Sequence, residues 1–396
     1  MESREEPLTS IEICAGAGGQ AVGLHQAKFK HVALVEIDPH AVRTLRENVK
    51  ARSGWSWERD NCDILEMDVT KFDPYEHLEK YGKRIPKGEL DLLAGGVPCP
   101  PFSHAGKQLG RDDERDLFPR MLELVEQLKP RAVMIENVRG IMDSKFDDYR
   151  GWIEAELQGG EYRRVDGVLG ATKGLGYKVC QWDILEASKF GVPQLRPRAI
   201  LVAIRNDVLK DLKYEWPSAT TEKPVSVVEA LQPTMKERFS RYFKGVHADQ
   251  AKSAYSKWLT AATLRAEGQE GKGDGIAPTL VGGSKKHGGA DLGPSRAKAA
   301  WRQLGVSGLG VANDPEVCEE KETEGRDLFG PDGPMLTVQQ AAIIQGFPAE
   351  WKFEGGKTAR YRQVGNAFPP PVAKAVGESI ADVLRAARKR DGAPVD

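Results

Sequence analysis

The 396-residue sequence has little of several features that mark particular protein classes. Its five cysteines, Cys14, Cys62, Cys99, Cys180 and Cys318, are scattered at spacings that match neither a disulfide framework nor a zinc site. No apolar run is long enough to cross a bilayer, and the polar, acidic start differs from a signal peptide. We therefore expect free thiols, no bound metal, no membrane partner and a cytoplasmic location.

The sequence also lacks an excess of positive or of negative charge, since its formal net charge is −1 at pH 7. The chain as a whole therefore gives no electrostatic signal for nucleic acid. The distribution is uneven, since the segment 205–298 holds five more Lys and Arg than Asp and Glu. A local excess of this size fits either contact with a phosphate backbone or an ordinary solvated surface.

Short β-rich runs alternate with helical patterns through the first half of the chain. We expect strands over Ser10–Cys14, Val32–Ile37, Ile64–Met67, Leu90–Ala94, Ala132–Glu136, Lys178–Ile184 and Ala199–Ile204. This alternation predicts an α/β fold with a parallel, doubly wound sheet. Ligands of such sheets bind beyond the carboxyl ends of the strands, so polar residues at those ends are the site candidates.

The first predicted strand is followed by a glycine-rich turn that includes Gly16, Gly18 and Gly19. Such a turn lets a ligand approach the backbone closely at the start of a helix. Glu36 ends the second strand, where a carboxylate can accept ribose hydroxyls, and Asp68 ends the third, where it can accept an adenine amino group. These features predict a nucleoside-containing cofactor, either a nicotinamide dinucleotide or S-adenosylmethionine, while a glycine turn beside solvated acids is the structural alternative.

Cys99 lies in the stretch Gly-Gly-Val-Pro-Cys-Pro-Pro over 95–101, just after the predicted strand at 90–94. The prolines fix the loop and withhold amide donors, so the thiol is held on a rigid turn, as a nucleophile would be. A buried structural cysteine is the alternative.

Glu136 follows the next apolar strand, where burial would raise the pKa of its carboxyl group and suit proton transfer. Alone, it could equally be a salt-bridged core residue.

Three further features complete the candidates. Arg196 and Arg198 alternate along an extended stretch, so their side chains point the same way and can converge on one site. The glycine-rich, basic and hydroxyl-bearing segment 271–289 suits contact with phosphate oxygens, or it is a flexible linker. Asn366 stands at the entrance of a predicted terminal helix and is another ligand contact.

Taken in order, these stretches resemble the DNA cytosine-5 methyltransferase family. The match covers about residues 8–205 and 335–385, and it rests on the glycine turn, Glu36, Pro98-Cys99, Glu136-Asn137-Val138, Gln194-Arg196-Arg198 and Gly365-Asn366. The intervening residues stand where the family has its variable target recognition domain, and Thr279-Leu280 resembles the dipeptide that such domains share. Cys14 and Pro100 depart from the family, which usually has Phe and Gln there.

The resemblance implies a Rossmann-like, S-adenosylmethionine-dependent methyltransferase sheet with a smaller, irregular target recognition domain. The implied domains are a catalytic and cofactor-binding domain over 1–205, a target recognition domain over 206–334 and a return to the catalytic domain over 335–396. A bacterial modification enzyme of this kind methylates carbon 5 of a flipped-out cytosine in a specific duplex DNA sequence, for restriction-modification or epigenetic marking. The implied enzyme is a nucleoid-associated monomer, with a cognate restriction endonuclease acting separately.

The resemblance also implies residue roles. Cys99 attacks carbon 6 of cytosine, Glu136 protonates ring nitrogen 3, Arg198 reaches the base oxygen, and Arg196 orders the site or meets a phosphate. The implied cofactor-binding residues are Cys14, Gly16, Gly18, Gly19, Glu36, Asp68, Pro98, Leu117 and Asn366. The alternatives are an RNA (tRNA) cytosine-5 methyltransferase, a nicotinamide-dependent oxidoreductase, which leaves Cys99 and Glu136 unexplained, and a catalytically inactive DNA-binding relative, against which both residues argue.

Overall fold

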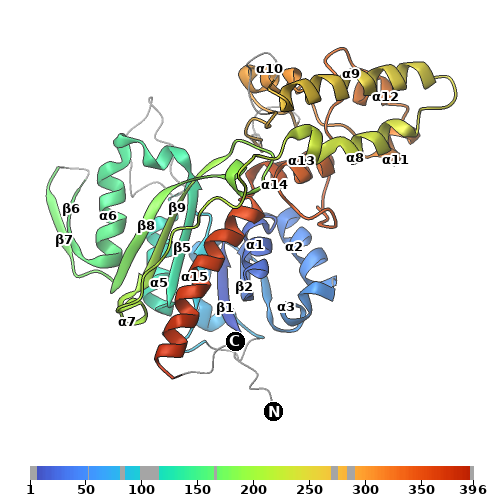
Figure 1. Cartoon of the computed structure of the whole chain (residues 1–396). Helices are drawn as coiled ribbons and strands as arrows, with labels where there is room; N and C mark the ends of the chain where they lie inside the picture. The colour runs from blue at the N-terminus through green and yellow to red at the C-terminus, as the bar shows by residue number, and fades with distance from the viewer. Residues whose placement is uncertain are drawn as a thin grey trace. The chain divides into compact units, whose positions relative to one another are not determined.

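The computed structural model describes residues 7–51, 53–80, 85–98, 116–164, 167–268, 275–282 and 290–392. Figure 1 traces the chain. Its residues pack into two compact units. Unit 1 consists of Met1–Leu185, Pro197–Ser218 and Val372–Asp396, and unit 2 consists of Glu186–Arg196 and Ala219–Pro371. The domain boundaries expected at 205 and 334 concern function and stay a prediction, whereas these two units are defined by packing.

Unit 1 is built on a seven-stranded sheet with the strand order β3-β2-β1-β4-β5-β9-β8. Its strands are β1 (Leu8–Ile13), β2 (Phe29–Glu36), β3 (Asp63–Glu66), β4 (Leu92–Gly95), β5 (Ala132–Val138), β8 (Tyr177–Glu186) and β9 (Pro197–Arg205). The strands β1 to β5 pair in parallel. A second, two-stranded sheet joins β6 (Gly160–Arg163) to β7 (Leu169–Thr172). The predicted α/β fold is confirmed.

The prediction of a wholly parallel sheet is wrong at β9, which runs antiparallel to β5. Only residues 187–196 connect the end of β8 to the start of β9. A parallel return needs a crossover of about a dozen residues or more, usually with a helix, so this short connection favours a reversal of direction.

The hairpin of β6 and β7 has no apolar alternation in its sequence, and its Val168 and Leu169 are exposed.

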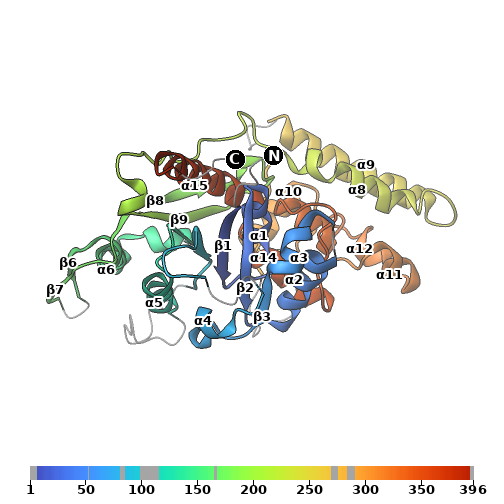
Figure 2. The same ribbon diagram turned by 90° about the horizontal axis from the view of Figure 1, so that it is seen from below.

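Helices cover both faces of the seven-stranded sheet, as Figures 1 and 2 show. One face carries α1 (Gly19–Gln26), α2 (Pro39–Ala51), α3 (Ser56–Asn61) and α15 (Pro370–Arg390), and the other carries α4 (Pro74–His77), α5 (Phe118–Leu128) and α6 (Asp147–Gln158). Shorter segments are η1 (Ser53–Trp55), η2 (Val69–Lys71), η4 (Arg139–Met142), η5 (Ser144–Phe146) and α7 (Asn206–Leu209). The main core lies on the α5 side, where Ile11, Leu93 and Val133 of the sheet join Phe118 and Met121 in one buried cluster.

The C-terminal helix α15 packs closely on α1. A Cβ placed on Gly377 would lie 2.8 Å from Leu24 Cδ2 and 2.9 Å from Ala27 Cβ. Nearer its end, Arg388 Nη2 donates to both oxygens of Asp91, at 3.0 and 2.8 Å. Asp91 is buried, so the pair joins the helix to the start of the β4 region without exposing the carboxylate to water.

Unit 2 is mainly helical. Its elements are η6 (Ala187–Phe190), α8 (Val227–Ser240), α9 (Ala248–Ala266), α10 (Ser295–Gln303), α11 (Pro315–Glu320), α12 (Glu324–Asp327), α13 (Val338–Ile344) and α14 (Lys357–Asn366). Figure 1 shows α8 and α9 as a pair of antiparallel helices that lie side by side. Pro233 lies inside α8, although proline usually argues against a helix because it has no backbone N–H to donate to the carbonyl one turn earlier.

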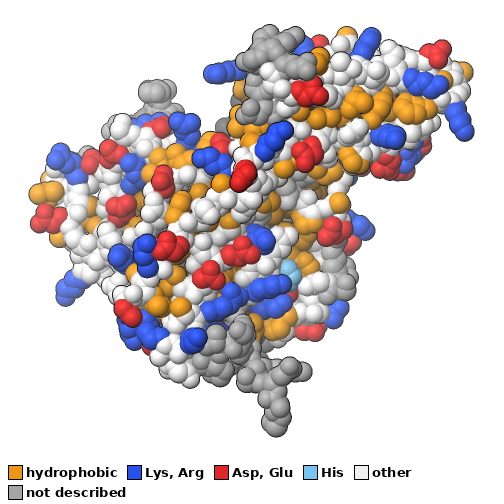
Figure 3. All heavy atoms as spheres, viewed as in Figure 1, with side chains coloured by type: hydrophobic (Ala, Val, Ile, Leu, Met, Phe, Trp, Pro, Cys, Tyr) orange, Lys and Arg blue, Asp and Glu red, His pale blue; other side chains and the backbone are white. Residues whose placement is uncertain are grey.

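The surface agrees with the charge balance of the chain. Figure 3 shows Lys and Arg side chains interspersed with Asp and Glu over the visible face, in line with a formal net charge of −1. Within the described ranges, no helix is long and apolar enough to cross a membrane.

We predict that Gly377→Ala destabilises the protein, although alanine favours helices. The new methyl group must displace Leu24 or Ala27, and overpacking of this kind costs about 1–3 kcal/mol. The matched control is Gly151→Ala in α6, where a Cβ meets nothing within 4 Å and helix propensity should add up to about 1 kcal/mol. Urea titration measures both free energies of unfolding. An unchanged or larger value for Gly377→Ala would contradict the packing of α15 on α1.

Candidate active site

The glycine-rich turn after β1 bends through left-handed backbone. Cys14, Gly16 and Gly18 have φ angles of 52°, 54° and 87°. Gly18 caps the start of α1, and its amide donates to the Ala15 carbonyl at 3.0 Å. A Cβ on Gly16 would meet nothing within 4 Å, so the backbone there borders open space. With Gly19 as its first residue, α1 therefore begins beside bare backbone, which is the arrangement expected of a ligand-binding turn.

Glu36 joins this turn to the end of β2. Its Oε2 accepts from the Gly16 amide at 2.8 Å. Its Oε1 accepts from the amides of Ile37 and Asp38, at 2.9 and 2.8 Å. A carboxylate has about four acceptor positions, so three are used by the backbone and about one is left for a ligand donor. The backbone thus fixes the orientation of this carboxylate.

Ile37 is a candidate site residue that the sequence interpretation did not include. It follows Glu36 directly, and it is 63% exposed although it ends a buried strand. A large apolar side chain exposed beside a fixed acid suits packing on a flat ligand ring. The apolar residue is visible in the sequence, but its exposure depends on where β2 ends.

Cys14 and Asp68 lie close to Glu36. Burial, followed by the charges of Glu36 and Asp68, raises the pKa of the Cys14 thiol to about 12. The Thr70 amide and hydroxyl donate to Asp68 Oδ1 at 2.9 and 2.8 Å, and these bonds lower the pKa of Asp68. Asp68 is therefore charged at neutral pH, whereas Cys14 is a neutral thiol and a poor nucleophile. The carboxyl ends of β1, β2 and β3 bring these three predicted residues together.

Two further thiols, those of Cys62 and Cys180, are also held in the neutral form. Burial raises the pKa of Cys62 and of Cys180. Cys14, Cys62, Cys180 and Cys318 are free cysteines. Cys99, the predicted nucleophile, and its neighbour Pro100 lie outside the described residues.

Glu136 and Arg198 form an ion pair at the carboxyl end of β5. Arg198 Nε lies 2.8 Å from Glu136 Oε1, and the two side chains are only 10% and 14% exposed. In the antiparallel register Arg198 stands opposite Val138, two residues beyond Glu136, so the pair is a diagonal contact across the strands. This contact is possible only because β9 runs antiparallel to β5. The guanidinium orients a largely buried carboxyl group.

The backbone that leads to Cys99 lies against this carboxyl group. A Cβ on Gly96 would lie 3.0 Å from Glu136 Oε2. Asn137 Nδ2 donates to the Val97 carbonyl at 2.8 Å, and Asn137 is buried. Pro98 follows as an exposed residue. Asn137 is a second residue whose role the sequence interpretation missed, because its partner is a backbone carbonyl from another strand.

Leu117 stands at the start of α5. The neighbouring Asp116 accepts from the Phe118 amide at 3.0 Å and from the Tyr149 hydroxyl at 2.7 Å. Leu117 itself is half-buried against the main core. These contacts belong to the packing of α5 on α6, and the cofactor role of Leu117 stays a prediction.

Arg196 belongs to unit 2 and has an environment unlike that of Arg198. It is buried, and its Nη1 donates to the Leu280 carbonyl at 2.6 Å. Its Nη2 donates to the carbonyls of Gly365 and Ala367, at 2.7 and 3.0 Å. The two guanidinium groups have different partners, because Arg198 pairs with a carboxylate of unit 1 and Arg196 donates to carbonyls of unit 2. Their convergence on one site stays a prediction. These contacts favour the ordering role of Arg196 over contact with a phosphate.

The same network joins three separated stretches within unit 2. The Oε1 atom of Gln194 accepts from the Leu280 amide at 2.8 Å. The Thr279 hydroxyl donates to the carbonyl of the residue after Gln194, at 2.6 Å. Asn366 ends α14 with its side chain exposed, and a Cβ on Gly282 would collide with its Oδ1. The cofactor role of Asn366 stays a prediction.

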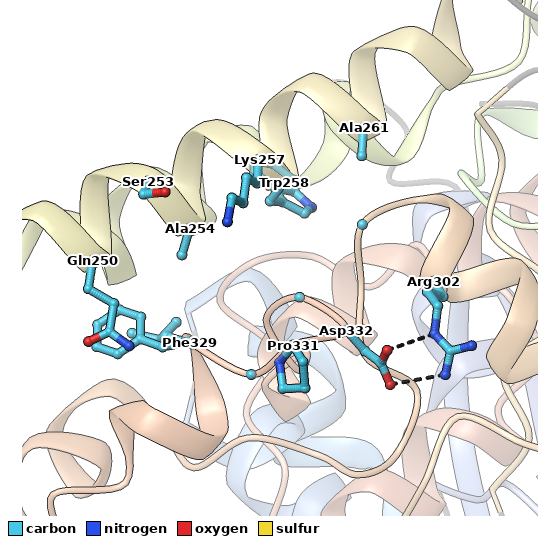
Figure 4. Close-up of a pocket in the computed structure, with 14 residues that line it drawn as sticks. Gln250, Ser253, Ala254, Lys257, Trp258, Ala261, Arg302, Phe329, Pro331 and Asp332 are labelled. Carbon is cyan, nitrogen blue, oxygen red and sulfur yellow. Dashed lines mark hydrogen bonds and ion pairs between the residues drawn. The ribbon is translucent and has the colours of Figure 1, made fainter.

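Unit 2 also contains a hollow between α9, the end of α10 and residues 328–333, which Figure 4 shows. Lys257 and Trp258 line it from α9. Arg302 pairs with Asp332 at its edge, with Nε 2.8 Å from Oδ1 and Nη2 3.0 Å from Oδ2. Its lining includes no residue predicted for the site. Elsewhere in the described ranges, no three His, Cys, Asp or Glu side chains gather as metal ligands would.

Comparison with known proteins identifies the family. The family model for C-5 cytosine-specific DNA methylases matches residues 8–382, and the chain belongs to that family. It is 44% identical over 380 residues to the type II methyltransferase M.NaeI of Lentzea aerocolonigenes, covering 96% of this chain and 76% of the relative. It is 41% identical over 381 residues to the type II methyltransferase M.NgoMIV of Neisseria gonorrhoeae, covering 96% and 98%.

Solved structures agree on the fold. A DNA modification methyltransferase encoded within an E. coli prophage aligns with a TM-score of 0.54 at 21% identity, over 95% of this chain and 99% of that one. The predicted family and the Rossmann-like methyltransferase fold are therefore confirmed. Family membership also excludes the nicotinamide-dependent oxidoreductase.

We predict that Gly96→Ala slows methyl transfer at least about tenfold, because the added Cβ displaces the Glu136 carboxyl group from its place against the backbone at Gly96. Cofactor affinity should stay near the wild-type value. The matched control is Gly140→Ala in η4, where a Cβ meets nothing within 4 Å. Single-turnover methylation of duplex DNA measures the rate. Equal rates for Gly96→Ala and the wild type would contradict this placement of Glu136.

Proposed function

We propose that the protein is a modification enzyme that transfers a methyl group from S-adenosylmethionine to carbon 5 of a flipped-out cytosine in a specific duplex DNA sequence. The observation that carries the proposal is the ion pair of Glu136 and Arg198, which lies against the backbone leading to Cys99. Identity of 41–44% to two type II methyltransferases over 96% of the chain supports it. The proposal includes action as a monomer, beside a separate cognate restriction endonuclease.

The carboxyl ends of β1 to β3 fit S-adenosylmethionine. Gly16 borders open space, and Gly18 begins a helix whose amides suit a carboxylate. Glu36 offers about one acceptor position to a ribose hydroxyl. Ile37 presents an exposed apolar surface to the adenine ring, and the charged Asp68 accepts from its amino group. Bound there, the cofactor supplies the methyl group that carbon 5 of cytosine takes up.

The other residues activate the cytosine ring, because carbon 5 alone is a weak nucleophile. The Cys99 thiolate adds to carbon 6, which forms an S–C bond and moves the electron pair of the C5–C6 double bond toward carbon 5. Glu136 donates a proton to ring nitrogen 3, and Arg198 holds that carboxyl group and reaches the base oxygen. After methylation the carbon 5 proton leaves to water. The S–C bond then breaks, which restores the double bond and the thiolate, and ring nitrogen 3 returns its proton to Glu136.

None of this chemistry is possible inside a stacked duplex, so the cytosine must leave the helix at a cost of a few kcal/mol. We assign residues 206–334 to recognition of the DNA, which must offset that cost. Arg196 holds the carbonyls of Leu280 and Gly365 within unit 2, so we assign it an ordering role there. The basic, glycine-rich segment 271–289 is the proposed contact with the phosphate backbone.

We predict that Cys99→Ala abolishes methyl transfer while cofactor affinity is unchanged, because the variant lacks the nucleophile and keeps the glycine turn. Cys180→Ala is the control, since burial holds its thiol in the neutral form. Incorporation of labelled methyl groups into duplex DNA reports activity, and calorimetry reports cofactor affinity. Activity that survives in Cys99→Ala would refute the mechanism, as would equal loss in Cys180→Ala.

We predict that transplanting residues 206–334 into a related methyltransferase transfers the target sequence as well, because the proposed recognition residues lie within them. Bisulfite sequencing of plasmid DNA from cells that express the chimera reports the methylated base and its site. A second chimera with residues 219–371, the continuous part of unit 2, keeps the partners of Arg196 together. An unchanged target in both chimeras would refute the assignment of the recognition domain.

A further inference from the structure

A buried polar pair lies next to the glycine turn, on the face of the sheet that carries α1. Glu12 of β1 and His31 of β2 are both 0% exposed, and His31 Nδ1 lies 3.1 Å from Glu12 Oε1. Gln20 donates from Nε2 to Glu12 Oε2 at 3.3 Å. His31 Nε2 lies 2.9 Å from the Ala21 carbonyl oxygen. The pair therefore contacts the two residues that follow Gly19 at the start of α1.

The partners of the pair determine how many protons it holds. A carbonyl oxygen only accepts, so His31 Nε2 carries a hydrogen. Nδ1 faces Ser10 Oγ at 2.8 Å and Glu12 Oε1 at 3.1 Å. Among the described residues, Oε1 has no donor unless a proton lies between it and His31. One shared proton leaves the pair without net charge, as a site closed to water requires.

Burial favours the neutral form of each partner. It raises the pKa of Glu12 to about 8 and lowers the pKa of His31 to about 4. At pH 7 the pair is therefore a carboxylic acid that donates to a neutral imidazole. Above about pH 8 the acid loses its proton, and two acceptors then face each other across 3.1 Å.

The charges of Glu58, His25 and Lys30 act on His31, and Glu12 acts on Cys62. Glu58 of α3 lies 3.0 Å from His25 of α1 and 3.8 Å from Lys30 of β2. Burial raises the pKa of Cys62, which precedes β3, and the charge of Lys50 offsets part of that effect. Lys50 of α2 titrates in the same range as Glu12, because burial lowers its pKa to about 8.

We propose that Glu12 and His31 are positioning residues for the cofactor turn, and that they hold the start of α1 against β1 and β2 through one shared proton. The inference rests on the proposed function, because it takes the glycine turn as the S-adenosylmethionine site. After the proton is lost, the single imidazole hydrogen serves two acceptors, the Ala21 carbonyl and Glu12 Oε1, so one of these contacts breaks. The turn before Ala21 then shifts and cofactor binding weakens. The groups that act on cytosine are untouched by this change.

The test compares the wild type with Glu12→Gln, which keeps a donor toward His31 and cannot titrate. Calorimetry measures the affinity of the full-length protein for S-adenosylmethionine from about pH 6 to about pH 9.5. Relative to Glu12→Gln, wild-type affinity should fall up to about tenfold per pH unit above about pH 8. The amino group of the ligand titrates near pH 8 in both proteins, so the difference between the two profiles is the readout.

Two further variants give this comparison its controls. Lys50→Arg keeps its positive charge through the range, so the wild-type fall above about pH 8 must persist in it. Glu12→Ala removes the proton donor, so it should bind S-adenosylmethionine several-fold more weakly than the wild type at pH 7. Its affinity should show no additional decrease above about pH 8 from residue 12, because alanine cannot titrate. The inference is overturned if the decrease in affinity above about pH 8 is equally large in Glu12→Gln, or if it is absent from Lys50→Arg. No cofactor binding by the wild type at any pH would instead overturn the proposed function.

Thermal unfolding gives an independent readout. The pKa of Glu12 is about 8 when folded against 4.5 for an ordinary Glu, so the folded protein binds more protons between these values. Stability from Glu12 is therefore greatest below about pH 4.5, falls as the pH rises to about 8, and is constant above. The Tm of Glu12→Gln should therefore rise relative to that of the wild type as the pH increases from about 4.5 to about 8. A constant Tm difference overturns the assigned proton.

Discussion

The ion pair of Glu136 and Arg198 is the contact on which the candidate active site depends. Nε of Arg198 lies 2.8 Å from Glu136 Oε1, and both side chains are largely buried. The pair exists because β9 reverses direction and sets its first residues beside the end of β5. The absence of a Cβ on Gly96 then lets the carboxyl group lie against the backbone that leads to Cys99. One antiparallel strand thus fixes the carboxyl group of Glu136, the proposed proton donor, against the backbone at Gly96.

The cofactor end of the site depends on a different constraint, the parallel alignment of β1 to β5. Parallel strands end at one edge of the sheet, so the glycine turn, Glu36, Asp68 and the end of β4 gather there although they are far apart in the sequence. Backbone amides orient Glu36, and the pair of Glu12 and His31 lies beneath the helix that follows the turn. Fixed polar groups require less reorganisation when a ligand binds, and this is the physical basis of catalysis by preorganisation.

Much of this site could be predicted from the sequence, because residues at the ends of apolar runs must fall at one sheet edge. Glu36, Asp68 and Glu136 follow from that rule. The direction of β9 and the partners of Arg196 could not be predicted, since alternation shows which residues share a side but not which unit they pack in. The role proposed for Ile37 depends on its exposure, and the proton proposed between Glu12 and His31 depends on a distance between two strands. Neither quantity can be obtained from a local sequence pattern.

The central claim is that Cys99 bonds covalently to carbon 6 of a cytosine held by Glu136 and Arg198. Duplex DNA with 5-fluorocytosine at the target position tests it directly, because fluorine cannot leave carbon 5 as a proton does and the S–C bond then persists. Incubation with S-adenosylmethionine, digestion and mass spectrometry locate the bound base. The account predicts a methylated base on the peptide that contains Cys99. A base on another cysteine, or none on a protein that methylates normal DNA, would contradict it.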